Sequence, residues 1–271
     1  MRSLLVLIML ALPAFGQDNS GLDRLTTRED LRGFEAVGRI DIQDGGFCTG
    51  TLVAADLVLT AAHCLFDDDQ QPIPAGRITF RAGLADGTSV VDAQVAQTVV
   101  HPDYRPVEPS PLDQIKIDVG LLKLVAPIPT SQIAPFAITV PGAGDEVSVV
   151  SYAAGRAEAL SWQRACQVVA RYDSLIAVDC DVTFGSSGAP VLDRSAGYRA
   201  KIVSLISVGS TYDGKPVAVG MELPDLVDFL KRGLRSGRAT TVAEDELAPR
   251  TAGKRIVIGE GNDTGARFVK P

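Results

Sequence analysis

Short apolar runs alternate with turn residues along most of this 271-residue chain. The runs are rich in Val, Ile, Leu and Thr, and Gly, Pro and Asp interrupt them at short intervals. Many short strands at near-regular spacing predict an all-β barrel or sandwich. The predicted strands cover 37–42, 49–62, 76–83, 89–100, 118–125, 145–153, 165–173, 175–182, 189–193, 199–209 and 215–222.

The apolar pattern changes at three places, and these changes suggest domain boundaries. A stretch with three prolines at 125–135 separates two groups of strands, so we predict one β-unit at 33–135 and a second at 136–234. The second unit ends in a segment, 223–234, whose apolar residues share one helical face, which predicts a short C-terminal helix. The chain then becomes polar and charged, and we interpret 235–271 as a linker and C-terminal extension.

The first residues have the pattern of an export signal. A basic start precedes an unbroken apolar run at 4–12, and small residues at Ala14 and Gly16 suit a cleavage site before Gln17. Nine apolar residues are too few for a membrane-spanning helix, which needs about 20. We therefore predict a signal peptide at 1–16, an N-terminal segment at 17–32 that is a candidate propeptide, and a protein exported to the periplasm or the extracellular medium with no membrane contact after signal removal.

Composition narrows the function classes. The apolar fraction of 46% permits a large core, and a net charge of −7 argues against nucleic-acid binding. Four cysteines in an exported protein suggest two disulfides, for which three pairings are open. Local pairing, Cys48 with Cys64 and Cys166 with Cys180, is the economical expectation. A zinc site, the alternative, would need clustered ligands such as two Cys-x-x-Cys pairs, which the sequence lacks.

A tight turn around Ser187 is the first candidate for chemistry. Glycines flank two serines in the segment GSSGAP at 185–190, ahead of an apolar strand. Such a turn can expose a hydroxyl and direct backbone N–H groups at one point, as an oxyanion hole requires. A plain Ser/Gly β-turn is the alternative, because such turns are common.

Chain order separates two enzyme architectures that place a serine in such a turn. An α/β-hydrolase runs Ser, Asp, His, but no histidine follows Ser187. The order His, Asp, Ser is available as His63, Asp118 and Ser187. His101 competes as the base and Asp113 as the acid. We favour Asp118 because an apolar strand follows it.

Four segments together resemble the trypsin-like serine proteases. They are CTGTLVAADLVLTAAHC at 48–64, VVHPDY at 99–104, DVGLLKL at 118–124 and GSSGAP at 185–190, and the likeness extends from about Gly33 to Leu234. The resemblance implies the chymotrypsin-like fold, two packed six-stranded antiparallel β-barrels with the site in the cleft between them. It also implies that a disulfide between Cys48 and Cys64 fixes the histidine loop.

The resemblance assigns roles to the candidate residues. Ser187 would be the nucleophile of a serine endopeptidase, His63 the general base and then acid, and Asp118 the group that orients His63. The N–H groups of Gly185 and Ser187 would form the oxyanion hole. Peptide bonds would break through an acyl-enzyme, polypeptides would be the substrates, no cofactor would be needed, and we expect a monomer.

The sequence departs from trypsin at the serine turn and the specificity pocket. Ser186 replaces the aspartate that, in trypsin, pairs with a new N-terminal amine, so the closer likeness is to bacterial trypsin-like and glutamyl-endopeptidase-type secreted enzymes. Asp181 has the spacing of the pocket aspartate that selects Lys or Arg, although a solvent-facing aspartate is the alternative. Ile206 stands where glutamyl-specific relatives place a histidine, which argues against a strong preference for Glu.

Other residues complete the predicted site. Ser207, Val208 and Gly209 resemble the edge that pairs with substrate backbone. Asp67, Asp68 and Asp69 form an acidic loop that could attract calcium, but neighbours in sequence seldom all point inward, so we interpret the loop as solvated and expect no metal site. The alternative function is a non-catalytic or latent protease-fold binding protein, since fold does not guarantee activity.

Overall fold

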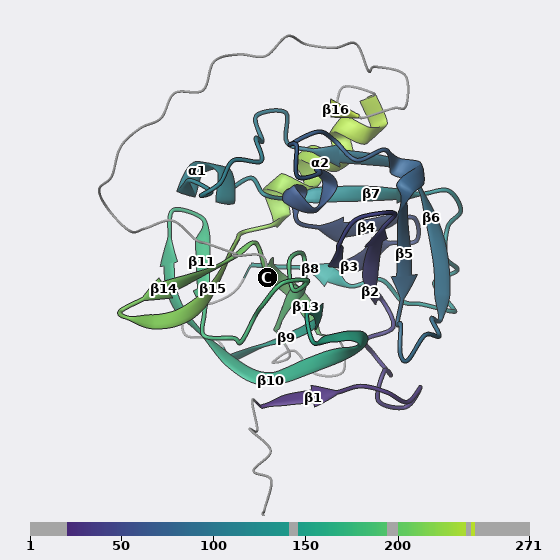
Figure 1. Ribbon diagram of the computed structural model, residues 1–271, viewed down its shortest axis with the longest axis horizontal. Helices are drawn as coiled ribbons and strands as arrows, with labels where there is room; N and C mark the ends of the chain where they lie inside the picture. Colours follow the sequence, from purple (N-terminus) through teal and green to yellow (C-terminus); the bar gives the residue numbers. More distant parts are fainter. Residues whose placement is uncertain (1–20, 141–145, 194–199, 237–239, 242–271) are drawn as a thin grey trace, which may run out of the picture.

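The computed structural model describes residues 21–140, 146–193, 200–236 and 240–241, and its strands fall into two groups packed side by side (Figure 1). Both groups are β-sheets, which confirms the all-β class. The predicted signal peptide at 1–16 lies outside the described residues, as does the predicted extension from residue 242 onward.

The first group is a closed barrel of six strands. The strands are β2 (Val37–Ile42), β3 (Phe47–Ala54), β4 (Leu57–Thr60), β5 (Ile78–Ala82), β6 (Val91–Val100) and β7 (Gly120–Leu124). They pair in the order β6-β5-β2-β3-β4-β7, and a further pairing of β6 with β7 closes the ring. Successive side chains of a strand point to opposite faces, so a closed ring buries every second residue. In β5, Ile78, Phe80 and Ala82 are buried inside the ring, and the residues between them are part-exposed.

The second group is a nine-stranded sheet. The strands are β1 (Leu22–Arg24), β8 (Ala137–Ile138), β9 (Glu146–Ala153), β10 (Arg156–Tyr172), β11 (Leu175–Val178), β12 (Pro190–Asp193), β13 (Lys201–Leu205), β14 (Val208–Tyr212) and β15 (Lys215–Met221). Their order is β14-β15-β11-β10-β9-β12-β13-β8, with β1 paired beside β10.

This second sheet differs from the expected closed barrel because it is curled. The predicted strand at 199–209 is broken at Ile206 and Ser207, where the chain changes partners: β13 pairs with β12, whereas β14 pairs with β15. Only these two residues separate β13 from β14, yet the two strands lie near opposite ends of the sheet order. The sheet therefore curls back toward itself, and β14 remains a terminal strand.

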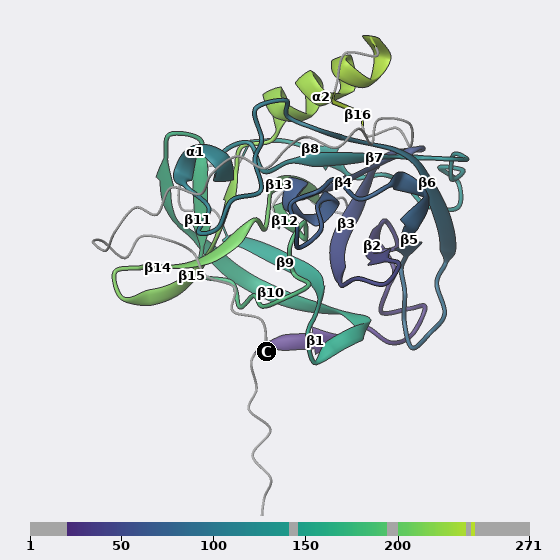
Figure 2. The same ribbon diagram turned by 45° about the horizontal axis from the view of Figure 1, so that its top comes forward.

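The segment before β2 connects the two units. Leu22 pairs with Gln163 through β1 and β10, and the Leu25 N–H donates to the Leu160 carbonyl at 2.8 Å. Leu31 and Phe34 are then buried in the core. Part of the predicted candidate propeptide is thus packed against the body of the protein, and β1 is seen alongside β10 in both views (Figures 1 and 2).

Helices are few and short. They are α1 (Leu112–Ile115), α2 (Pro224–Ser236) and two 3₁₀ turns, η1 (Ala62–Leu65) and η2 (Ala75–Arg77). The predicted C-terminal helix is α2, whose buried Val227 and Leu230 lie on the apolar face. A two-residue strand, β16 (Thr240–Thr241), then pairs with β6. None of the described helices is long and apolar enough to span a membrane.

Candidate active site

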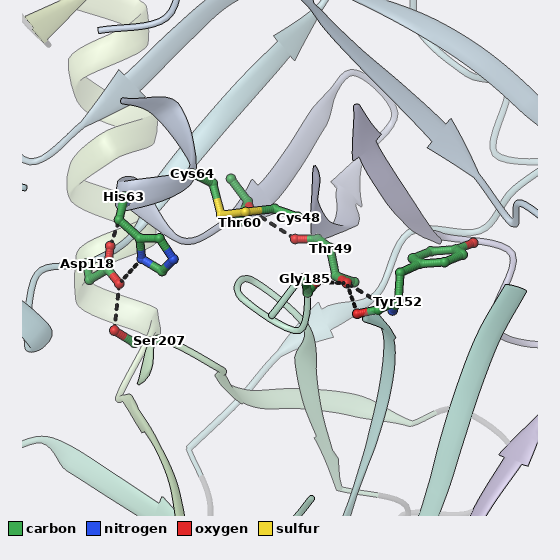
Figure 3. The surroundings of a disulfide bond; sticks show 9 residues. All are labelled: Cys48, Thr49, Thr60, His63, Cys64, Asp118, Tyr152, Gly185 and Ser207. Atoms are coloured by element: carbon green, nitrogen blue, oxygen red, sulfur yellow. Dashed lines mark hydrogen bonds and ion pairs between the residues drawn. A yellow bond between two sulfur atoms is a disulfide. The ribbon is translucent and has the colours of Figure 1, made fainter. Parts of the chain in front are cut away.

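His63 lies in the short η1 turn that follows β4 of the barrel. Its side chain is 33% exposed. The adjacent Cys64 is buried and bonded to Cys48 of β3, which ties the turn to the barrel wall (Figure 3). The second disulfide joins Cys166 to Cys180, so both expected pairings are confirmed.

Asp118 precedes β7 and is almost wholly buried. Its Oδ1 accepts the His63 backbone N–H at 2.8 Å, and its Oδ2 lies 2.8 Å from His63 Nδ1. The Ser207 hydroxyl donates to the same Oδ2 at 2.6 Å (Figure 3). One carboxylate thus holds both the backbone and the ring of His63. Because Nδ1 faces a carboxylate, we assign the ring proton to Nδ1, which leaves the Nε2 lone pair free.

Charge attraction controls the protonation of this pair. Burial disfavours both charged forms, but the attraction and hydrogen bonding of Asp118 outweigh it and raise the pKa of His63. Burial likewise opposes ionisation of Asp118, yet His63, Ser207 and the His63 N–H together lower the pKa of Asp118. The pair is therefore poised to accept a proton on His63 while Asp118 stays ionised.

Ser187 lies at the junction of the two β-units and is 7% exposed. The Thr49 N–H of β3 donates to the Ser187 carbonyl at 2.9 Å. The next residue, Gly188, has φ +79°, and a Cβ there would lie 2.3 Å from both Thr49 O and Thr60 Oγ1. Only glycine fits this close approach. The serine turn is thereby pressed against the segment that leads into His63.

Two N–H groups of this turn are oriented and unused. Among the described residues, neither the Gly185 nor the Ser187 N–H donates a hydrogen bond, whereas the Ser186 N–H donates to Thr183. The Phe184 carbonyl accepts from Ala154 at 2.7 Å, and the Ser186 carbonyl accepts from Ala189 at 2.9 Å. A trans peptide points its N–H opposite to its C=O, so these bonds fix the direction of the Gly185 and Ser187 N–H groups. Both groups can therefore receive an anion.

The predicted substrate-binding residues separate into two sets. Val208 and Gly209 belong to β14, which stands at the end of the sheet order and pairs only with β15 in the described chain. Asp181 is exposed, and its N–H donates to Gln163 Oε1 at 2.6 Å. Its carboxylate therefore faces water in this structure.

His101 and Asp113, the other candidates for base and acid, lie in different surroundings. His101 accepts a hydrogen bond from the Asp103 N–H at 3.2 Å and stacks on Phe229, with ring centroids 4.9 Å apart. Asp113 is exposed on α1. Neither residue contacts the His63 and Asp118 pair through a hydrogen bond that the described chain shows.

Two places in the described residues gather groups that could bind a metal. Cys48, His63 and Cys64 are the one group there with ligand atoms close together, but the two sulfur atoms are bonded to each other at 2.00 Å. A disulfide supplies no thiolate for a metal. In the acidic loop, Asp67 Oδ1 accepts the N–H groups of Asp69 at 3.0 Å and Gln71 at 2.8 Å, as in a turn cap.

Sequence reasoning missed the side-chain roles of three residues. Ser207 is predicted on the edge that pairs with substrate backbone, and its hydroxyl also donates to Asp118. Tyr104 is buried, and burial together with the charge and hydrogen bonding of Asp118 raises the pKa of its phenol. The Thr49 hydroxyl donates to the Gly185 carbonyl at 2.8 Å (Figure 3). No sequence signal marks Thr49, whereas Tyr104 closes the segment VVHPDY.

The fold and these contacts define a two-unit β-protein with a His–Asp pair on the barrel and a glycine-flanked serine turn packed against the residues just before His63. The family model described as "Trypsin-like peptidase domain" matches residues 48–198. This match covers more than half of the chain, and the chain belongs to the trypsin-like peptidase family.

Two relatives are consistent with that membership. The "Serine protease SP24D" of Anopheles gambiae is 35% identical over 106 residues, which cover 38% of this chain and 35% of that protein. The aligned part is thus about a third of that relative's length. The solved "Structure of Glu endopeptidase in complex with MPD" superposes with a TM-score of 0.64 over 80% of this chain and 96% of that chain, at 19% identity, a likeness of fold alone.

Proposed function

We propose that this chain is an exported serine endopeptidase that hydrolyses peptide bonds through an acyl-enzyme on Ser187. The observation that carries the proposal is the pairing of His63 with the buried Asp118, beside a serine turn whose two free N–H groups are fixed in direction. Family membership and the two disulfides are consistent with it.

In the first step the Ser187 Oγ attacks the carbonyl carbon of the substrate. The hydroxyl proton passes to Nε2 of His63, and the resulting imidazolium is stabilised by Asp118, which keeps its own charge. The carbonyl oxygen becomes an oxyanion and accepts hydrogen bonds from the Gly185 and Ser187 N–H groups. The C–N bond then breaks, the leaving amine takes the proton from Nε2, and the acyl group remains on Ser187.

In the second step water hydrolyses the acyl-enzyme. His63 removes a proton from water, the hydroxide attacks the acyl carbon, and Ser187 leaves with the proton from Nε2. The substrate backbone is expected to pair with the open edge of β14 near Val208 and Gly209, because an extended peptide can add to a terminal strand. Both His63 and Ser187 return to their initial states.

An active-site-directed phosphonate tests the proposal. We expect stoichiometric labelling of the protein and none of the Ser187→Ala variant, since the phosphonate needs an activated serine. Ser174→Ala, a change at an exposed serine of the β10–β11 turn, is the matched control and should label like the parent. Folded protein that neither takes the label nor cleaves a mixed peptide library would instead be a protease-fold binding protein.

The same library tests the specificity pocket. We propose that Asp181 attracts Lys or Arg side chains, but its exposure screens the charge, so the expected preference is modest, about tenfold or less. Asp181→Asn should remove the preference and leave cleavage of neutral peptides unchanged. Equal cleavage after Lys and Leu in the parent would contradict this part of the proposal.

A further inference from the structure

Ser186, between the two residues that supply the proposed oxyanion hole, is held from inside the protein. It is fully buried. Its hydroxyl accepts from the Thr183 N–H at 3.3 Å, donates to Ser151 Oγ at 3.4 Å and accepts from Arg156 Nη2 at 3.4 Å. The centre of the turn is therefore anchored by side chains of the second sheet.

Arg156 is the centre of this cluster. It is the first residue of β10 and is half-buried. Its Nη1 donates to the Ser151 carbonyl at 2.8 Å, and its Nη2 donates to Ser151 Oγ at 3.0 Å as well as to Ser186. The planar guanidinium has its donors in a fixed fork, so it sets the distance between the two serines.

No carboxylate of the described chain lies within ion-pair distance of Arg156. Burial lowers its pKa, against a weaker attraction from Asp181. A half-buried cation without an ion-pair partner costs stability unless its hydrogen bonds compensate. All of its hydrogen bonds in the described chain go to Ser151 and Ser186, so these two serines hold the guanidinium in place.

The connection between β9 and β10, which ends at Arg156, makes a second contact with the serine turn. Ala154, two residues earlier, donates its N–H to the Phe184 carbonyl at 2.7 Å and so orients the Gly185 N–H. One short connection between β9 and β10 thus contacts the serine turn on both sides of Gly185. A shift of this connection would rotate the peptide groups that face the substrate.

We propose that Arg156 is a positioning residue that holds the Gly185–Ser187 turn in the form that binds the oxyanion. It acts through Ser186 and Ser151 and does not touch the substrate. This inference rests on the proposed function, because the oxyanion forms only when Ser187 attacks the substrate carbonyl. It implies that transition-state binding depends on Arg156 more than ground-state binding does.

The Arg156→Ala variant tests the proposal with peptide substrates. We expect kcat to fall by about 10- to 10²-fold, less than or comparable to the loss of one oxyanion donor, with KM changed by less than about threefold. Affinity for a peptide aldehyde, whose adduct places an oxyanion in the hole, should fall by the same factor as kcat/KM. Affinity for the non-covalent product peptide should stay within about threefold.

Two further variants and one control sharpen the result. Arg156→Lys, or added guanidinium ion with Arg156→Ala, should restore part of kcat because each replaces a donor. Ser186→Ala keeps the guanidinium and removes its link to the turn, so it should lower kcat and aldehyde affinity together, by about three- to tenfold. Arg164→Ala is the matched control, since Arg164 is an exposed cation on the same strand.

The outcomes separate this proposal from the proposed function. Unchanged kcat and aldehyde affinity in Arg156→Ala and Ser186→Ala would overturn the positioning role, as would an equal loss of aldehyde and product affinity, which is general damage. Should Arg156→Ala not fold, Ser186→Ala decides by the same two affinities. Activity that survives Ser187→Ala would instead overturn the serine mechanism itself, whatever Arg156 does.

Discussion

The closed barrel holds the base through one buried carboxylate, whereas the curled sheet holds the nucleophile through peptide hydrogen bonds, with the Arg156 and Ser151 side chains behind Ser186. His63 is held by the Asp118 carboxylate and by the neighbouring disulfide of Cys64. Ser187 is held by peptide hydrogen bonds on each side and by the close approach of Gly188 to the barrel. The Asp118 charge therefore acts directly on the base, whereas the groups that hold the nucleophile act through the orientation of its peptides. Substitutions should affect the two halves in different ways.

The largest effect is expected from Asp118→Asn in the barrel half. The Asn NH2 group would donate to Nδ1 of His63 and so force the ring proton onto Nε2, the wrong tautomer for a base, and kcat should fall about 10⁴-fold with little change in folding. Steady-state kinetics and thermal unfolding measure this. Asp113→Asn, a change at the exposed aspartate of α1, is the control, and an equal loss there would mean that the wrong acid has been assigned.

Gly188→Ala tests the backbone half. The added Cβ would meet Thr49 O and Thr60 Oγ1 at 2.3 Å and Ala61 N at 2.9 Å, so the serine turn must move away from the barrel. We expect a loss of about 10²-fold or more in kcat/KM, together with lower stability, because small misplacements of reacting groups are costly.

Gly87→Ala is the control for Gly188→Ala, because it introduces the backbone strain of a positive φ without a steric clash. Gly87 has a similar φ of +82° but nothing within 4 Å of an added Cβ. It should cost about 1–2 kcal/mol of stability from strain alone and leave kcat/KM unchanged. If both glycine variants lose activity alike, the contact of Gly188 with the barrel is not what holds Ser187.

The two disulfides allow a matched comparison. They close loops of similar length, with sequence separations of 16 and 14, so replacing either pair by serines should lower the free energy of unfolding by about 3 kcal/mol. Only removal of Cys48–Cys64 should also lower kcat, because that bond fixes the His63 turn. Denaturant unfolding and kinetics on both double variants would show this, and equal kcat losses would contradict it.

The smallest effect is a shift in pH dependence. Asp118 raises the pKa of His63 above its ordinary value of about 6.5, and a protonated His63 cannot accept the serine proton. Thus kcat/KM should fall as the pH drops through this raised pKa. The NMR titration of His63 should move to lower pH in Asp118→Asn, where burial remains and the attraction is lost. His101, the other histidine, is the internal control.

Much of the fold could be predicted because the strands have regular burial patterns. The prediction for β2 is matched at both ends, and the helix at 223–234 lies within one to two residues of α2. Strand β10 begins nine residues earlier than the predicted 165–173. Its first half, RAEALSWQR, mixes charged and apolar residues without a clear period, since it lies between β9 and β1 and its pairing depends on distant segments.

At the site, chain order and residue type suggested His63, Asp118 and Ser187, but not the contacts that support them. The bond from Ser207 to Asp118 spans 89 positions, and that from Arg156 to Ser186 spans 30. Neither has a local sequence signal, because the first depends on how the curled sheet meets the barrel and the second on how separate strands of the sheet come together. The spacing of Asp181 leaves two interpretations open, a pocket aspartate or a solvent-facing one, and in the structure Asp181 is exposed.

The first described strand has a consequence for the order in which the protein folds. Leu22 of β1 pairs with Gln163 of β10, although the next strand, β2, belongs to the barrel. During synthesis the start of the chain must therefore wait for residues more than a hundred positions later before it can complete its hydrogen bonds. Closing so long a loop is slow, and a chain made from its N-terminus would hold β1 unpaired until β10 has been synthesised.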